Sequence, residues 1–96
     1  MSGPLSGLRV VDITNVVAGP SCAAQLADQG ADVIKVEPPA GDLIRKSAAS
    51  GLPPIFISCN RGKRSLAIDL KHARSKDVLW RLMERADVLV QNLRPG

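Results

Sequence analysis

Two short apolar runs, separated by a helix-sized segment of small residues, constrain the fold of this chain more than any other feature. Leu8 to Ile13 is β-branched and too short for a helix, and Asp32 to Glu37 has the same character. Between them, Ser21 to Gln29 suits a helix, with Pro20 at its first position and Gly30 as its left-handed C-terminal cap. Strand, helix and strand fill about thirty residues, the length of one right-handed βαβ unit.

The rest of the chain continues this alternation. Prolines and glycines break any period between Pro38 and Arg61, which predicts an irregular loop with a short strand near Ile55 to Ser58. Ser65 to Leu70 alternates like a half-buried strand, Val78 to Ala86 has helical spacing, and Val88 to Val90 is a final strand. The order predicts an α/β fold with a mostly parallel sheet and flanking helices. We expect an incomplete domain, because no helix is predicted after the last strand.

Composition narrows the possible functions. No segment approaches the roughly 20 apolar residues of a membrane span, and the N-terminus lacks a signal-peptide pattern, so we expect a cytoplasmic protein with no membrane partner. Cys22 and Cys59 lack CxxC spacing and His72 lacks other ligands nearby, which predicts two reduced, buried thiols and no metal site. The net charge of +4 favours an anionic ligand. The positive charge is concentrated between Arg61 and Lys76.

Several motif interpretations compete. Gly19 is followed by Pro20, so the first βα turn cannot form a Gly-x-Gly-x-x-Gly dinucleotide cradle, and Glu37 is expected to be a solvated strand end or to help order the following loop. Asn60 to Ser65 places three cations around a glycine, which suits either phosphate binding or ordinary solvated surface. Four aspartates are expected to cap or face solvent: Asp12, Asp32, Asp69 and Asp87.

Two further classes are disfavoured. A reader of single-stranded nucleic acid needs aromatic side chains to stack on bases, and the only candidates, Phe56 and Trp80, are few and expected to be buried. Ser21 and Ser65 lack a plausible general base, which disfavours hydrolysis by a serine nucleophile. Since ligands of parallel sheets bind beyond the carboxyl ends of the strands, the site is expected among Asn15–Gly19, Glu37–Asp42, Lys71–Ala73 and Gln91–Arg94. The residues alone indicate an anion-binding α/β domain.

Six blocks, in order, carry a resemblance to a known family: Gly7–Asp12, Val17–Pro20, Gly30–Glu37, Asn60–Ser65, Asp69–Lys71, and Ala86–Val90 with Asn92–Gly96. Together they resemble the class III CoA-transferases, a family that includes formyl-CoA transferase, carnitine CoA-transferase and α-methylacyl-CoA racemase. The match spans Pro4 to Gly96.

This resemblance implies a Rossmann-like large domain and, in full-length members, an interlocked homodimer. Residues 1–96 would be its N-terminal CoA-binding segment, with the catalytic region absent: transferases use a downstream aspartate, and racemases a downstream histidine and aspartate. Coenzyme A or an acyl-CoA would be the substrate, together with carboxylic acids, and no metal or redox cofactor is expected. The chain would be part of a transferase, part of a racemase, or a truncated non-catalytic CoA-binding module, and alone it is expected to be inactive.

Family contacts to CoA carry over to nine positions: Val17, Ala18, Ile68, Asp69, Leu70, Lys71, Asn92, Leu93 and Arg94. The resemblance implies that Lys71 and Arg94 neutralise phosphates and that Ile68 and Leu70 flank the adenine. Asn92 and Ala18 would offer polar groups to the linker.

Three positions depart from the formyl-CoA transferases, which have a glutamine at 17, a cation at 38 and an aromatic at 93. Here they are Val17, Pro38 and Leu93. Losing the aromatic removes stacking on adenine, and losing the cation weakens phosphate binding. These departures disfavour oxalate-specific formyl transfer.

Overall fold

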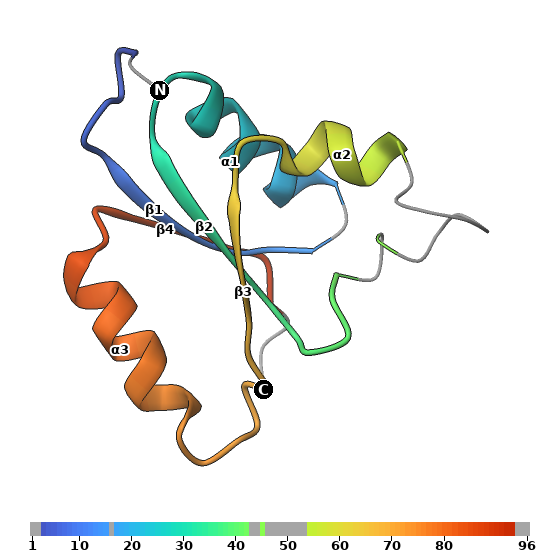
Figure 1. The fold of residues 1–96 in the computed structure, drawn as a ribbon, viewed down its shortest axis with the longest axis vertical. Coiled ribbons are helices and arrows are strands. Elements are labelled where there is room, and N and C mark those ends of the chain that lie inside the picture. Colours follow the sequence, from blue (N-terminus) through green and yellow to red (C-terminus); the bar gives the residue numbers. More distant parts are fainter. Residues whose placement is uncertain (1–2, 16, 43–44, 46–53, 94–96) are drawn as a thin grey trace.

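A computed structural model describes residues 3–15, 17–42, 45 and 54–93 (Figure 1). Its strands and helices follow in the order β1 (Arg9–Ile13), α1 (Ala18–Asp28), β2 (Asp32–Glu37), α2 (Pro54–Asn60), β3 (Arg64–Ala67), α3 (Ser75–Arg85) and β4 (Val88–Gln91).

The four strands form one sheet in the order β3-β2-β1-β4, and every neighbouring pair is parallel. The chain runs outward from β1 to β3 and then crosses back to place β4 on the other side of β1. Helices α1 and α3 pack on opposite faces of the sheet (Figure 1). Strands are added to one side of β1 up to β3 and to its other side with β4, so the position between β1 and β4 is the topological switch point of a doubly wound sheet. The prediction of a Rossmann-like α/β fold with a parallel sheet is confirmed.

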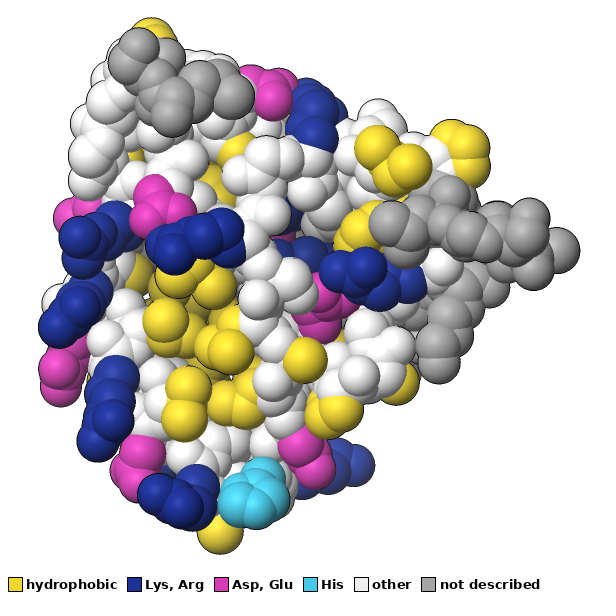
Figure 2. Space-filling model, in the orientation of Figure 1, with side chains coloured by type: hydrophobic (Ala, Val, Ile, Leu, Met, Phe, Trp, Pro, Cys, Tyr) yellow, Lys and Arg dark blue, Asp and Glu magenta, His cyan; other side chains and the backbone are white. Residues whose placement is uncertain are grey.

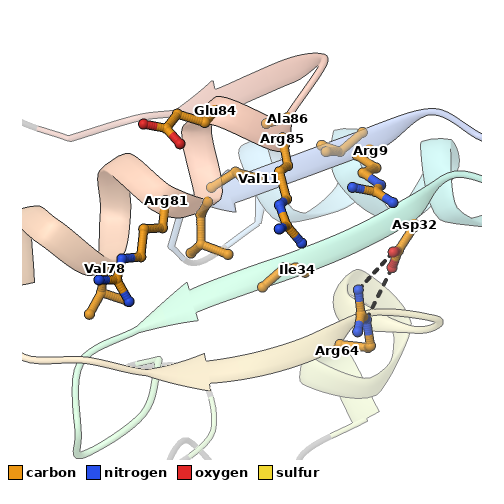
Figure 3. Close-up of a pocket in the computed structure, with 12 residues that line it drawn as sticks. Arg9, Val11, Asp32, Ile34, Arg64, Val78, Arg81, Glu84, Arg85 and Ala86 are labelled. Atoms are coloured by element: carbon orange, nitrogen blue, oxygen red, sulfur yellow. Dashed lines mark hydrogen bonds and ion pairs between the residues drawn. The ribbon is translucent and has the colours of Figure 1, made fainter.

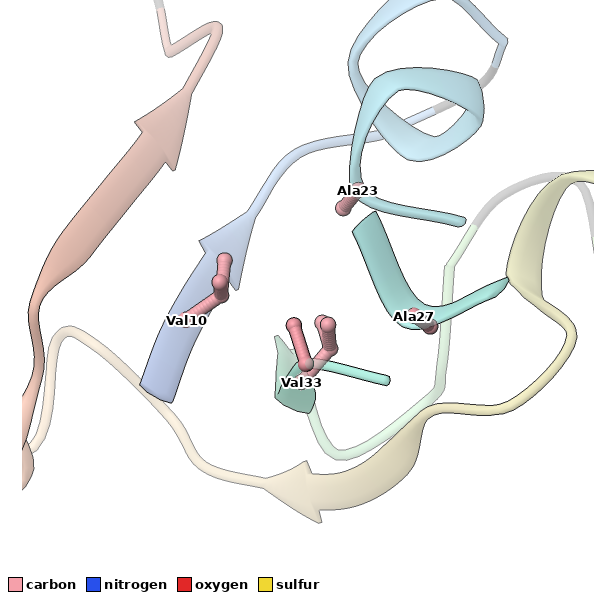
Figure 4. Close-up of a cluster of buried hydrophobic side chains, with 5 residues drawn as sticks. Val10, Ala23, Ala27 and Val33 are labelled. Carbon is pink, nitrogen blue, oxygen red and sulfur yellow. The ribbon is translucent and has the colours of Figure 1, made fainter. Parts of the chain in front are cut away.

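Small side chains let α1 lie close to the sheet. Ala23 and Ala27 of the helix meet Val10 and Val33 of the two central strands, with Ala31 completing the cluster (Figure 4). Val10 and Val33 are each only 1% exposed, so burial of either side chain contributes about 1.5–3 kcal/mol to stability. This cluster fixes the position of α1 and of the turn that precedes it.

The opposite face is less completely covered. Val11, Ile13 and Val36 form its buried centre, against half-buried side chains of the α3 region: Leu79, Leu82, Met83 and Ala86. Ser75 is the only buried residue of α3, and Trp80 is 66% exposed, so the expectation of a buried tryptophan was wrong.

Most predicted elements agree with the structure, and Gly30 has the expected left-handed conformation, with φ of 101°. The strand expected near Ile55 to Ser58 is wrong, because these residues belong to α2. Pro54 suits a first helical position, and Phe56, Cys59 and Asn60, at spacings of three and four residues, form the buried side of that helix. Cys59 is buried as predicted, but Cys22 is exposed.

The strand predicted from Ser65 to Leu70 is shorter than expected, since β3 ends at Ala67. Residues Ile68 to Lys71 therefore leave the sheet at its carboxyl end. Within the described part of the chain, no helix is long and apolar enough to cross a membrane.

Candidate ligand site at the carboxyl ends of the strands

The ends of β1 and β4 are joined at the switch point by a pair of asparagines. The amide nitrogen Nδ2 of Asn92 donates to the carbonyl of Asn15 over 3.0 Å, and the backbone N–H of Asn15 donates to Oδ1 of Asn92 over 3.2 Å. Val17 and Ala18 follow β1, and Leu93 follows β4, all three exposed. The structure thus brings four of the predicted site residues to the carboxyl ends of two adjacent strands.

The predicted residues Ile68 to Lys71 follow β3, at the other edge of the sheet. Three strand spacings separate β3 from β4, or about 14 Å at the usual 4.8 Å per spacing. Leu70 and Lys71 are exposed there, whereas Ile68 packs against the core beneath α3. Asp69 accepts a hydrogen bond from the backbone N–H of Lys71 over 2.9 Å, which shapes this turn. Arg94 lies outside the described residues.

Beneath the β1–α1 turn lies a buried ion pair. The ammonium of Lys63 is 2.6 Å from Oδ2 of Asp12, and the two side chains are 2% and 0% exposed. Lys63 also donates to Oδ1 of Asn60 over 2.8 Å and to the carbonyl of Pro20 over 3.0 Å. Burial lowers the pKa of Lys63 below its usual range, and the hydrogen bond to Asp12 partly opposes this shift. Asp12 was expected to cap the backbone or to face solvent: it does accept the backbone N–H of Thr14 over 3.0 Å, but its side chain lies in the interior.

A second buried pair joins β2 to the loop that follows it. Nζ of Lys35 lies 2.9 Å from Oδ2 of Asp42, and both side chains are almost fully buried. The same ammonium donates to the carbonyl of Thr14 over 3.1 Å. Lys35 therefore ties the end of β1 to the loop after β2.

Glu37 forms the third pair, with Arg45. Both carboxylate oxygens accept from this guanidinium at 2.7 Å, the backbone N–H of Asp42 donates over 2.9 Å, and the hydroxyl of Ser65 also donates. Burial alone raises the pKa of Glu37, but the hydrogen bonds from Arg45, Ser65 and Asp42 outweigh it and lower the pKa to about 2. Arg45 also lies over the ring of Phe56, 4.1 Å from its centroid. The expectation that Glu37 is a solvated strand end was wrong, while its role in ordering the following loop is confirmed.

The basic segment Asn60 to Ser65 does not present three cations to a phosphate. Lys63 pairs with Asp12 in the interior, Arg61 pairs with Asp28, and Arg64 pairs with Asp32. The pairs of Arg61 and Arg64 are solvent-exposed and lie towards opposite ends of the segment Asn60 to Ser65. Each cation already has a carboxylate partner, so this segment organises the fold.

A groove of about 590 Å³ lies elsewhere, between α3 and the sheet. Val11 and Ile34 of the sheet and Leu82 of α3 are among its apolar lining residues. Arg9, Arg81 and Arg85 stand around it (Figure 3). Figure 2 shows apolar side chains gathered on this face, with basic and acidic side chains along part of their border. Arg9, Asp32 and Arg64 come from the starts of strands, so the groove opens towards their amino ends, away from the predicted ligand site.

The parallel strand order and the switch point between β1 and β4 define a doubly wound, Rossmann-like α/β fold. Residues 5–96 match the model of CoA-transferase family III. The chain belongs to this family.

Named relatives support this assignment. The chain is 47% identical to a succinyl-CoA:mesaconate CoA-transferase of Haloarcula hispanica over 98% of its own length and 26% of the relative's. It is 42% identical to a formyl-CoA:oxalate CoA-transferase of Escherichia coli, over 100% of this chain and 24% of the relative.

Solved structures agree with the sequence comparison. A CAIB/BAIF family protein from Brucella suis superposes with a TM-score of 0.91 at 38% identity, over 97% of this chain and 26% of that one. The protein Rv3272 from Mycobacterium tuberculosis gives a TM-score of 0.91 at 43% identity, over 99% of this chain and 27% of that one. The chain thus spans about a quarter of the length of the relatives it matches.

Proposed function

We propose that this chain is the CoA-binding part of an acyl-CoA transferase that moves CoA between carboxylic acids, and that CoA lies across the carboxyl ends of β1 and β4. The main support is the pair Asn15 and Asn92 at the switch point, where doubly wound sheets bind their ligands. The exposed Val17 and Ala18 follow Asn15 in the sequence, and the exposed Leu93 follows Asn92.

CoA is an extended ligand, which suits a site spread along one end of a sheet. In the proposed arrangement, Val17, Ala18, Asn92 and Leu93 contact it near the switch point, and Lys71 neutralises a phosphate at the β3 edge. Ile68, Asp69 and Leu70 shape the turn that presents Lys71, and Arg94 is proposed as a second phosphate contact.

The acidic side chains near the site are already engaged, which argues that the catalytic carboxylate comes from elsewhere in the enzyme. Asp12 is held in a buried ion pair, Glu37 in a partly buried one, and Asp69 accepts the backbone N–H of Lys71. A carboxylate neutralised by a buried cation is a poor nucleophile towards an acyl-CoA. We therefore propose that this chain alone binds CoA without turning it over.

Transfer is favoured over racemisation by the names of the relatives, which are CoA-transferases. His72 gives no support to racemisation, because its Nδ1 accepts the backbone N–H of Arg74 over 3.1 Å and it is exposed at the surface. An interlocked homodimer and a cytoplasmic location are proposed for the whole enzyme on the basis of the family.

The test is a titration of the ¹⁵N-labelled chain with CoA, followed by NMR. We expect shifts at the amides of Val17, Ala18, Asn92 and Leu93, and no thioester transfer on adding an acyl-CoA and an acceptor acid. Lys71→Ala should weaken binding about fivefold, or about 1 kcal/mol, whereas Lys76→Ala, another exposed lysine beyond β3, should not.

Two outcomes would contradict the proposal. Shifts confined to the groove residues Arg81 and Arg85 would indicate that the phosphates bind to the arginines of that face. A well-dispersed spectrum without any change at millimolar CoA would remove the site from this chain.

A further inference from the structure

The structure assigns to Lys63 the role of a positioning residue: through its ammonium, it holds the β1–α1 turn that carries Val17 and Ala18. This inference deepens the proposed function and rests on it for the part that concerns CoA. The positioning itself follows from the contacts of Lys63 alone.

The ammonium of Lys63 makes contacts to three separate elements. It donates to Asp12 on β1 over 2.6 Å, to Asn60 at the end of α2 over 2.8 Å, and to the carbonyl of Pro20 in the first turn of α1 over 3.0 Å. An ammonium has three N–H donors, so each donor has one acceptor. The side chain is 2% exposed, which shields these bonds from water.

Asp12 extends this anchor to the other end of the turn. While its Oδ2 contacts Lys63, its Oδ1 accepts the backbone N–H of Thr14 over 3.0 Å and also the Thr14 hydroxyl. One ion pair therefore holds Thr14, where the turn begins, and Pro20, where α1 is established. Val17 and Ala18 lie between these two fixed points.

Asn92 and Lys35 already hold the backbone of Asn15 and Thr14 at the β1 side of the turn. Lys63 adds a bond at the α1 side, to the carbonyl of Pro20. Val17 occupies the N-cap position of α1 and provides no side-chain hydrogen bond to the helix, and the first turn contains no acidic residue. Both Val17 and Ala18 are exposed. A loop with few buried contacts of its own takes its position from its anchors, so the geometry of these two residues depends on Lys63 at the α1 side of the turn.

The test compares the wild-type chain with Asp12→Asn/Lys63→Met, which removes both buried charges together and keeps an acceptor for Thr14. The matched control is Arg64→Met. Arg64 is the next residue after Lys63, and this substitution breaks its solvent-exposed ion pair with Asp32. Removing only the lysine would leave an uncompensated buried carboxylate, so the double variant is the better test of position.

Amide hydrogen exchange reports on the turn without CoA. The N–H of Ser21, which donates to the carbonyl of Val17 over 2.8 Å, should exchange about tenfold faster in the double variant, relative to Val10 and Val33 in the sheet. In Arg64→Met this ratio should stay at the wild-type value. An unchanged ratio in the double variant would overturn the assignment, because general destabilisation accelerates all these amides together.

CoA titration then links position to binding. If the wild-type chain binds CoA, the double variant should bind it about tenfold more weakly with a sheet that is still folded, and Arg64→Met should bind as the wild type does. Equal affinity in the double variant would refute the link to CoA. If the wild-type chain binds no CoA, the proposed site fails while the exchange measurement still decides the role of Lys63.

Discussion

Asn92 continues the pairing of β4 with β1 beyond the last backbone partners, because its side chain exchanges two hydrogen bonds with the backbone of Asn15. The strand register ends with Ile13 opposite Gln91, one residue before Asn92. A side-chain amide has the same donor and acceptor as a peptide group, so it can replace one in a ladder. This bond pair fixes the relative position of the two strand ends at the switch point.

Asn92→Asp should disturb both the fold and the proposed site. The aspartate loses the donor to the carbonyl of Asn15 and places two oxygens face to face, so urea unfolding should show a loss of about 1 kcal/mol. CoA affinity, measured by calorimetry, should fall further, because the new charge repels the phosphates. Gln91→Glu is the control: it adds the same charge next door and keeps the acceptor for the N–H of Leu93. Similar losses in both variants would mean that charge alone matters.

The ion pair of Glu37 and Arg45 makes the free energy of unfolding depend on pH in the acidic range. The folded pKa of Glu37 is about 2, against 4.5 without the interactions of the fold. Because the folded value is the lower one, the contribution is full above about pH 4.5 and is lost as the pH falls towards 2. At 1.36 kcal/mol per unit, it amounts to about 3 kcal/mol.

Glu37→Gln should therefore remove part of the acid dependence. Thermal unfolding followed between pH 2 and pH 6 should show a shallower change than in the wild type, together with lower stability at pH 6. Asp28→Asn is the control, because Asp28 and Arg61 are exposed and solvent screens their pair. A slope unaltered by Glu37→Gln would show that Glu37 is not the residue whose protonation destabilises the fold.

Gly19 leaves no room for a side chain at the start of α1. A Cβ at this position would lie 2.5 Å from Cβ of Thr14, which cannot move without shifting β1. Gly19→Ala should therefore displace the β1–α1 turn and weaken CoA binding about tenfold in addition to lowering stability. Gly30→Ala lowers stability at the other end of α1, since its φ of 101° is unfavourable for alanine. Gly30→Ala should leave the CoA affinity of the folded protein unchanged. An equal loss of affinity in both variants would contradict the explanation that Gly19→Ala acts by displacing the β1–α1 turn.

The sequence predicted the scaffold well because local patterns determine it. The runs Leu8 to Ile13 and Asp32 to Glu37, and the glycine at position 30, each carry their own signal over a few residues. Helix α2 was missed for the opposite reason. Its seven residues begin with the second of two consecutive prolines, and the spacing of its three buried residues is too short to distinguish a helix from a strand.

The buried charges could not be predicted, because their partners lie far apart in the sequence. Lys63 is 51 residues from Asp12, and neither neighbourhood indicates the other. A lysine or aspartate inside a strand normally suggests a solvated face, so the local sequence offered little reason to place Lys35 or Asp12 in the interior. The one available signal was that Asp12 and Lys35 interrupt otherwise apolar strands, each on the face that also contains a buried valine, Val10 or Val33.

The two cysteines should differ sharply in reactivity. Cys22 is exposed on α1, whereas Cys59 is 6% exposed on α2 and accepts a hydrogen bond from the hydroxyl of Ser21 over 3.4 Å. Iodoacetamide should therefore alkylate Cys22 in the native chain and reach Cys59 only when α2 separates from α1 or the chain unfolds. Mass spectrometry of timed samples distinguishes the sites, with Cys22→Ser as the control that should remain almost unmodified. Equal alkylation rates of Cys22 and Cys59 under native conditions would mean that α2 does not stay packed on α1. Asn60, one of the three acceptors of Lys63, would then also leave its position.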